Sequence, residues 1–216
     1  MKKIVIKLIL AGLTTAGCMV FTSGSSQAQT ATFTAVRAGI KGGFNASTLD
    51  LQNVNNRKEA YGFHAGVFAQ IPAGDFFAIQ PELLYTAKGA SANYNVAFFQ
   101  GRNTFRLNYL ELPILATFKV GPSVELQAGP YGAYLLSANM NSEGTFGTGS
   151  QRLNTNDFNK FDLGLAGGVN IYFGKAFLGL RYGQGLNRIT NTEGARLFLG
   201  DARNAVGMVS IGYSIR

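Results

Sequence analysis

Apolar and polar residues alternate at every second position along most of this chain. Residues 61–71, with the sequence YGFHAGVFAQI, show the pattern clearly. A period of two predicts β-strands, because successive side chains of a strand point to opposite faces. Eight such segments are found, and each is predicted to form one strand: about 36–45, 61–71, 77–88, 105–119, 124–137, 161–174, 177–187 and 204–216.

The connections between these segments alternate between short and long. Short turns lie at 72–75, 120–123 and 174–176, and long polar connections lie at about 46–60, 89–104, 138–160 and 188–203. Strands of roughly ten residues can cross a bilayer at a tilt, and short turns at one rim with long loops at the other are typical of outer-membrane barrels. The predicted fold is therefore all-β: an eight-stranded antiparallel up-and-down transmembrane β-barrel, closed so that no strand edge meets lipid.

The fourth segment changes phase along its length. Its apolar residues occupy even positions from Leu110 to Phe118, whereas Phe105, Leu107 and Tyr109 are apolar at odd positions. A β-bulge near Tyr109 and Leu110 would join the two halves, because one extra residue reverses the side-chain phase.

Alternation alone does not identify the face that meets lipid. The polar face is rich in glycine, which suits the crowded lumen of a narrow barrel, and aromatic residues of the apolar face gather near strand ends, as in interfacial girdles. We therefore expect the apolar face outside, and the alternative is a soluble secreted barrel with an aromatic core. Burial of Ile40, Val67 and Ile171 together, with Lys41 and Arg181 outside, would refute the membrane interpretation.

Composition favours the same class. Charged residues make up 14% of the chain, with 28 Gly and no Trp, whereas soluble domains average roughly 25% charged residues. The formal net charge is +8, and a predicted signal peptide with three Lys and no acid reduces it to 8 − 3 = +5. The basic residues are spread singly, which argues against nucleic acid as a partner, because nucleic-acid binding needs a concentrated basic stripe.

Residues 1–28 are predicted to be a cleavable signal peptide, followed by the barrel domain at 29–216. Lys2 and Lys3 begin a positive region, an apolar stretch follows, and residues 26–28 (SQA) fit a small-x-small cleavage site. The single cysteine of the sequence, Cys18, follows a partial lipoprotein box, so lipidation is an alternative. Cleavage after residue 28 leaves a mature chain without thiol chemistry.

Five short motifs occur in order along the chain: QPELLY at 80–85, NYLELPI at 108–114, AGPY at 128–131, FDLGL at 161–165 and LRYG at 180–183. Together they resemble the strands of the PorT-like outer-membrane β-barrel family of Bacteroidota-type bacteria, over about residues 35–215. The resemblance implies a barrel similar in shape to OmpA-like and OmpX-like barrels, with no defined activity. Such chains often end on an aromatic residue that the barrel-insertion machinery reads, whereas this one ends Ile215-Arg216.

Several charged residues fall on the inward face at a similar height above the short turns. We predict that they form one paired and hydrogen-bonded lumen cluster, made of Lys41, His64, Glu82, Glu111 and Arg181. The alternative is an active site or a gated conduit, although an eight-stranded barrel has a lumen barely wide enough for its own side chains.

The residues needed for common enzyme chemistry are scarce. His64 is the only histidine, and no serine neighbours it on its face of the strand, as a Ser-His-acid hydrolase would require. One histidine and no mature cysteine argue against a metal site, and no Gly-Lys-Ser/Thr sequence follows the glycines at 144–149 to cradle phosphate. We therefore expect no enzyme activity, no metal and no cofactor.

Three prolines lie inside predicted strands, where each removes one ladder hydrogen bond. Pro81, Pro113 and Pro130 occur on consecutive strands, five or six residues above a short turn. We predict that they form one lateral band of bulges or weakened pairing, and the alternative is that each proline is accommodated independently.

The predicted role is that of an integral protein of the cell outer membrane. Its long extracellular loops would carry a structural, adhesive or interaction function. The expected partners are outer-membrane lipid and lipopolysaccharide, the barrel-insertion machinery, and an unidentified protein at the loops. Two alternatives stay open, a narrow transport or secretion-accessory barrel and a membrane-embedded lipid hydrolase.

Overall fold

The computed structural model of the protein describes residues 33, 35–50, 57–96, 99–144, 147–153, 155, 159–187 and 203–215. The chain divides into two units, Met1–Thr30 and Ala31–Arg216, and the described residues belong to the second. The expected signal peptide at 1–28 and Cys18 therefore lie outside the described residues, as does most of the long connection 188–203. The domain boundary at residue 28 stays a prediction.

The described part of the chain contains nine β-strands, and every pair of neighbouring strands is antiparallel. Their bounds are β1 Arg37–Asp50, β2 Arg57–Pro72, β3 Phe77–Val96, β4 Phe99–Lys119, β5 Val124–Gly144, β6 Gly147–Arg152, β7 Phe161–Phe173, β8 Ala176–Gly185 and β9 Arg203–Ser214. Within these described ranges, no helix has both the length and the apolar character needed to span a membrane.

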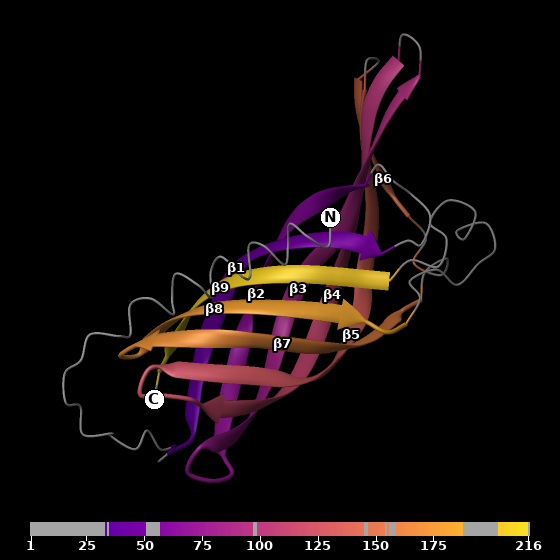
Figure 1. The fold of residues 1–216 in the computed structure, drawn as a ribbon. Helices are drawn as coiled ribbons and strands as arrows, with labels where there is room; N and C mark the ends of the chain where they lie inside the picture. Colours follow the sequence, from indigo (N-terminus) through magenta and orange to yellow (C-terminus); the bar gives the residue numbers. More distant parts are fainter. Residues whose placement is uncertain are drawn as a thin grey trace. The chain divides into compact units, whose positions relative to one another are not determined.

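The sheet closes on itself. β1 pairs with both β2 and β9, and β4 pairs with both β3 and β5, so that β1–β5 and β7–β9 form an unbroken ring (Figure 1). This ring confirms the predicted eight-stranded antiparallel barrel. β6 pairs only with β5 among the described residues and lies outside the ring. The turn between β7 and β8 contains Gly174 at φ 66°, a left-handed conformation that glycine adopts without steric cost.

Three strands extend far beyond their predicted ends. The region 89–104, expected to be a loop, forms the outer part of the β3–β4 hairpin, whose register is continuous from Leu84 to Val96. The expected loop at 138–160 likewise contains the end of β5 and all of β6. Figure 1 shows this extension projecting beyond the closed ring. The sequence pattern missed it, because a strand with water on both sides needs no apolar face.

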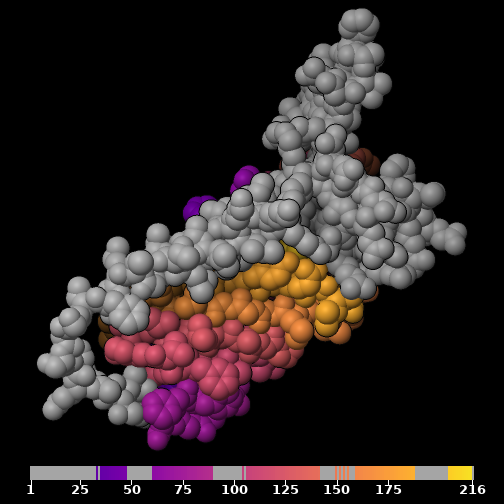
Figure 2. Space-filling view, viewed as in Figure 1, coloured from indigo at the N-terminus to yellow at the C-terminus, as the bar shows by residue number. Residues whose placement is uncertain are grey.

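The apolar face of the barrel is outside. Ile40 and Val67 are 55% and 51% exposed, whereas Lys41 and Arg181 are buried. Most aromatic residues expected in the girdles are also exposed, and Figure 2 shows the side chains of one face of this surface. Exposed apolar side chains on every strand of a closed barrel fit hydrocarbon as the surrounding solvent, so the expected orientation is confirmed.

Glycine on the inward face allows neighbouring groups to approach closely. A Cβ atom at Gly212 would overlap the ring of Phe177, and one at Gly164 would lie 2.5 Å from ring atoms of Tyr131. The aromatic side chains in the lumen therefore lie flat over positions that have no side chain. This packing accounts for the inward glycines at 39, 164 and 212, each of which lies under an aromatic ring.

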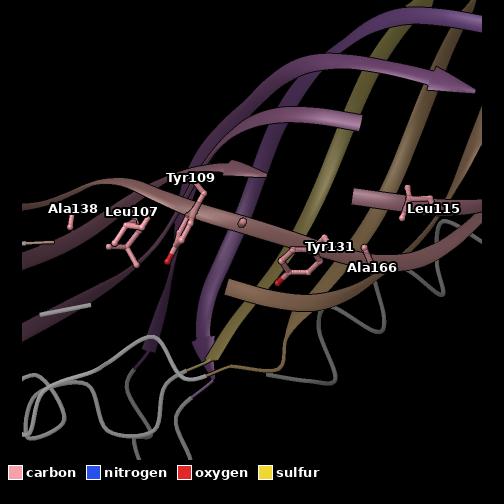
Figure 3. Close-up of a cluster of buried hydrophobic side chains, with 8 residues drawn as sticks. Leu107, Tyr109, Leu115, Tyr131, Ala138 and Ala166 are labelled. Carbon is pink, nitrogen blue, oxygen red and sulfur yellow. The ribbon is translucent and has the colours of Figure 1, made fainter. Parts of the chain in front are cut away.

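The irregularity expected near Tyr109 is present in the β4–β5 pair, but the expectation that it reverses the phase of β4 was wrong, because β4 keeps a single phase. Leu107, Tyr109 and Glu111 are all buried, and Leu110 is exposed. The β4–β5 register does shift between Asn108 and Tyr109, but the extra residue is Leu136 on β5. Leu107 and Tyr109 point inward and belong to an inner apolar cluster (Figure 3): Leu107, Tyr109, Leu115, Tyr131, Ala133, Leu135, Ala138 and Ala166.

Candidate functional site

The lower charge cluster consists of Lys41 on β1, Glu82 on β3 and Arg181 on β8. Arg181 binds the Glu82 carboxylate with two hydrogen bonds, of 2.6 Å from Nη1 to Oε2 and 2.8 Å from Nη2 to Oε1. The Lys41 Nζ atom lies 3.4 Å from both carboxylate oxygens. All three residues are buried. The paired geometry of guanidinium and carboxylate makes this a strong, directional contact across the lumen.

Glutamine side chains extend the lower charge cluster toward the periplasmic rim. Gln80 Nε2 donates to Glu82 Oε1 at 2.7 Å, and Arg181 Nη2 donates to Gln127 Oε1 at 2.8 Å. Gln127 Nε2 in turn donates to Gln80 Oε1 at 3.0 Å. Hydrogen bonds of this kind reduce the cost of removing charged groups from water.

The upper charge cluster consists of Lys88 on β3, Glu111 on β4 and Asp162 on β7. Lys88 Nζ lies 2.6 Å from Glu111 Oε2 and 3.5 Å from Asp162 Oδ2. It also lies 4.5 Å from the ring centroid of Tyr131. Asn204 donates a hydrogen bond of 2.8 Å to Asp162 Oδ2. The fully buried ammonium group is thus held between two carboxylates and an aromatic face.

His64 lies between neutral partners and belongs to neither charge cluster. Its Nδ1 atom is 2.6 Å from Asn45 Oδ1, and its Nε2 atom is 2.8 Å from Ser210 Oγ. Asn45 uses its Nδ2 group to donate to the carbonyl oxygens of Phe63 and Ala87. Its Oδ1 atom is therefore the acceptor, and His64 Nδ1 carries a hydrogen. Ser210 lies on β9, so a search along the histidine's own strand missed it.

The structure distributes the five predicted lumen residues over three sites. Lys41, Glu82 and Arg181 are in contact, whereas Glu111 pairs with Lys88, and His64 binds Asn45 and Ser210. Lys88 and Asp162 were not among the predicted residues, although both lie on polar faces of predicted strands. Across the two clusters, three basic side chains meet three carboxylates, so their formal charges cancel (3 − 3 = 0).

Aromatic side chains close the lumen near the periplasmic rim. The lower aromatic cluster consists of Phe68, Tyr172 and Phe177, and the Phe177 ring centroid is 5.5 Å from that of Phe68 and 5.0 Å from that of Tyr172. Below it, Phe33 is buried, its backbone N–H donates to the Asp75 carbonyl at 2.8 Å, and Lys119 Nζ lies 4.5 Å from its ring centroid. The upper charge cluster packs against the inner apolar cluster itself, because Lys88 Nζ lies over the rings of Tyr109 and Tyr131.

Ladder pairs are missing beside each of the three strand prolines. In the β2–β3 ladder, Pro81 and the residue before it have no pairing partner, although the pairs on either side, Phe68↔Glu82 and Ile71↔Ile79, are formed. The β3–β4 ladder has the same gap at Pro113, and the β4–β5 ladder has it at Pro130. The register does not shift at any of these gaps, so the prolines interrupt pairing without adding a residue. The three gaps occupy neighbouring rows of the sheet.

The structure contains no metal-binding cluster within its described residues, since no three His, Cys, Asp or Glu side chains gather there. The Ser210–His64–Asn45 arrangement has the order of a nucleophile, a base and an orienting group. All three residues are nevertheless buried on the inward face of a filled barrel. In this position the three side chains tie β1, β2 and β9 together.

A closed antiparallel barrel with an apolar exterior and a charged, filled interior defines an integral protein of the outer membrane. The chain belongs to the outer membrane protein beta-barrel domain family, whose model matches residues 27–191. The family and the fold place the protein in the cell outer membrane. No curated protein matches the sequence.

Several solved barrels are similar to this chain. The attachment invasion locus protein Ail of Yersinia pestis, in complex with the heparin analogue sucrose octasulfate, has 13% identity and a TM-score of 0.49, covering 84% of this chain and all (100%) of that one. Neisserial surface protein A has 13% identity and a TM-score of 0.43, covering 82% and 96%. OprG from Pseudomonas aeruginosa has 15% identity and a TM-score of 0.35, covering 84% and 94%. The closed fold follows from the chain's own strand pairing and not from these likenesses.

Proposed function

We propose that this protein is a filled outer-membrane barrel whose structural, adhesive or interaction role is carried by the extracellular extension of β3, β4, β5 and β6. The main support is the lumen. Its buried salt bridges and apolar layers occupy the space through which a solute would have to pass. A barrel filled in this way serves as a rigid membrane anchor, and its contacts with partners are made outside the membrane.

The length of the extension supports the same proposal. Leu110 is the outermost large apolar residue on the outer face of β4 among the side chains described, whereas β4 begins at Phe99. The eleven-residue difference corresponds to about 35 Å of extended strand. A paired hairpin of this length presents a surface at little further entropic cost on binding, because its backbone is already ordered.

A hairpin exchange tests the proposal. Residues 91–104 are replaced by Asn-Gly, which favours a two-residue turn, while the register pair Ala90 and Phe105 is kept. We expect the variant to fold and to insert, because the ring is unchanged, and cells that carry it to lose attachment to surfaces or partner cells. The measurement is adhesion of cells expressing equal amounts of the wild-type and shortened proteins.

The control is the same Asn-Gly replacement of residues 73–76 in the β2–β3 turn at the opposite rim, which shortens the protein without touching the extension. Heat-modifiability on a gel verifies that both variants are folded. Equal adhesion of wild type and hairpin variant would contradict the proposal.

We also propose that the chain belongs to the PorT-like branch of its family, on the five motifs given above. This assignment supports the alternative of a secretion-accessory barrel. Under that alternative, deletion of the gene would retain a cargo protein in the periplasm, and the hairpin variant would restore secretion. Under the adhesive proposal, secretion is unaffected by the deletion.

A membrane-embedded hydrolase is the second candidate, and it rests on the Ser210–His64–Asn45 geometry. A fluorophosphonate probe tests it, because an activated Ser210 Oγ would form a bond to phosphorus, His64 would accept the proton, and fluoride would leave. We expect no labelling of the folded wild type, because Ser210 is buried in the lumen. Labelling of wild type that is lost in Ser210→Ala would establish the hydrolase and contradict the proposal of a filled anchor.

A further inference from the structure

Lys88 of the upper charge cluster places a buried amine beside two buried carboxyl groups. Its Nζ atom lies 2.6 Å from Glu111 Oε2 and donates a hydrogen bond of 3.5 Å to Asp162 Oδ2. The lysine and the aspartate are 74 positions apart in the sequence, so the fold alone brings them together. Positioned groups react from separations of about 3–3.5 Å. An amine and a carboxyl group, the two components of an amide bond, are therefore in contact inside the barrel.

Aromatic rings keep the surroundings of this amine apolar. Lys88 Nζ lies 5.4 Å from the ring centroid of Tyr109 and 4.5 Å from that of Tyr131, two rings that Figure 3 shows in the inner apolar cluster. Ionised groups are costly to hold in such surroundings. Transfer of one proton from Lys88 to Asp162 turns the ion pair into a neutral amine and a neutral acid. These are the forms that condense to an amide.

The two carboxyl oxygens of Asp162 have different surroundings. Oδ2 accepts hydrogen bonds from Asn204 Nδ2 at 2.8 Å and from the Tyr131 hydroxyl group at 3.4 Å. Oδ1 is buried and has no hydrogen-bond partner within the described part of the chain. Gly185 lies beside Oδ1, where a Cβ atom would come within 2.9 Å of it. The donors at Oδ2 stabilise negative charge that develops there, and Oδ1 is the oxygen that is free to leave.

We propose that Lys88 and Asp162 form an intramolecular amide (isopeptide) bond, with Glu111 as the catalytic base. The neutral Lys88 nitrogen attacks Cγ of the protonated Asp162 carboxyl group, and negative charge develops on Oδ2. Glu111 accepts a proton from the nitrogen and passes it to the Oδ1 hydroxyl group, which leaves as water. One N–C bond forms, one C–O bond breaks, and Glu111 ends ionised as it began. The condensation requires no co-reactant.

The bond would join β3 to β7, two strands that are not neighbours in the ring. The covalent loop that it closes, residues 88–162, contains the whole extracellular extension of β3, β4, β5 and β6. A covalent tie at the base of the extension would hold the barrel closed beneath it when the extension is pulled. The bond forms inside the ring, so the inference does not depend on the adhesive role.

The lower charge cluster provides an internal comparison. Lys41 Nζ also lies 3.4 Å from a buried carboxylate, that of Glu82. Both oxygens of this carboxylate bind the Arg181 guanidinium group, at 2.6 and 2.8 Å, and this contact favours the ionised form. We therefore expect the Lys41–Glu82 contact to stay an ion pair.

Mass spectrometry of the folded protein, purified from membranes and then denatured, tests the proposal. We expect the mass of wild type to be lower than that of its sequence by one water molecule, with the N-terminus read from the same digest. Trypsin should leave Lys88 uncut and joined to the peptide of Asp162, and should cut after Lys41. Glu111→Gln and Lys88→Arg should keep the full mass. The matched control is Lys175→Arg in the exposed β7–β8 turn, which should still lose one water.

Asp162→Asn is a second variant, which keeps the lysine and the base. Its side-chain amide would leave as ammonia, so the variant should form the same bond and reach the same final mass as reacted wild type. The full sequence mass in folded wild type would overturn the proposal. Loss of water that persists in Lys88→Arg would also overturn it, because that loss would come from cyclisation of an aspartate. Complete reaction in Glu111→Gln would refute the role of Glu111 as the base.

Discussion

At the scale of single residues, Glu82 determines the stability of the lower charge cluster. It is the carboxylate that both Arg181 and Lys41 contact. Glu82→Ala would leave two buried cations without this partner, and we expect the free energy of unfolding to fall by about 3–5 kcal/mol. Glu111→Ala should have a similar effect on Lys88. Urea unfolding of the barrels in lipid vesicles measures both.

Asp75→Asn in the exposed β2–β3 turn is the control, and it should change the unfolding free energy by less than about 0.5 kcal/mol. Midpoints equal to wild type for both Glu82→Ala and Glu111→Ala would show that the interior charges contribute nothing to stability.

Gly212 provides a second prediction, based on shape. A methyl group at this position would overlap the Phe177 ring. We expect Gly212→Ala to destabilise the barrel by about 1–3 kcal/mol, the usual cost of overpacking, and Phe177→Leu to restore part of the loss in the double variant. Gly74→Ala is the matched control, since a Cβ there meets nothing within 4 Å. Additive losses in the double variant would argue against direct contact between the two positions.

The sequence predicted which residues face inward but not which of them meet. Lys41, Glu82 and Arg181 were identified because alternation fixes the face of each residue. The partners of His64 could not be identified in this way, because Asn45 and Ser210 come from β1 and β9, and strand tilt and stagger decide which residues share a level. Lys88 had the same inward phase as Glu82, and only the structure shows its contact with Asp162.

At the scale of strands, the proline gaps lead to a prediction about β2–β5. Valine at Pro81, Pro113 and Pro130 would supply the missing N–H groups, and we expect each single change to stabilise the barrel by about 0.5–1.5 kcal/mol. If the gaps form one band, the triple variant should gain more than the sum of the single variants. The free energies of unfolding of the single and triple variants distinguish one band from three independent gaps. Strictly additive gains would support independent accommodation of each proline. Pro72→Val at the end of β2 is the control.

The strands also show which parts of the fold hydrophobic periodicity predicts and which it misses. It located the parts of all eight ring strands that cross the membrane, because lipid requires an apolar outer face there. It missed the outer parts of β3, β4 and β5 and the whole of β6, where no such requirement exists. β6 has the sequence GTGSQR, which contains no apolar side chain to mark it as a strand. Its assignment depends on register with β5, a property of the folded sheet.

At the scale of the whole molecule, charge is separated between interior and rims. The lower charge cluster has a formal charge of 2 − 1 = +1 and the upper one 1 − 2 = −1, so together they cancel, and the predicted mature charge of +5 is carried by residues outside them. An aqueous pore would leave inward charges free to attract ions. Here each is bound to an opposite charge, and aromatic rings cover the periplasmic end.

This arrangement predicts that the protein does not conduct. In planar bilayers we expect no discrete openings from wild type at any voltage below the breakdown of the membrane, because an ion would have to break the Arg181–Glu82 contact and displace the Phe68, Tyr172 and Phe177 rings. The double variant Phe177→Ala/Glu82→Ala lacks one ring of the lower aromatic cluster and the carboxylate of the lower charge cluster. We expect openings to occur first in this double variant. Discrete openings of the wild type would favour the transport alternative and show that the interior charges form a gate. Openings that occur in the double variant but not in the wild type would show that the lower aromatic cluster and the lower charge cluster together seal the barrel.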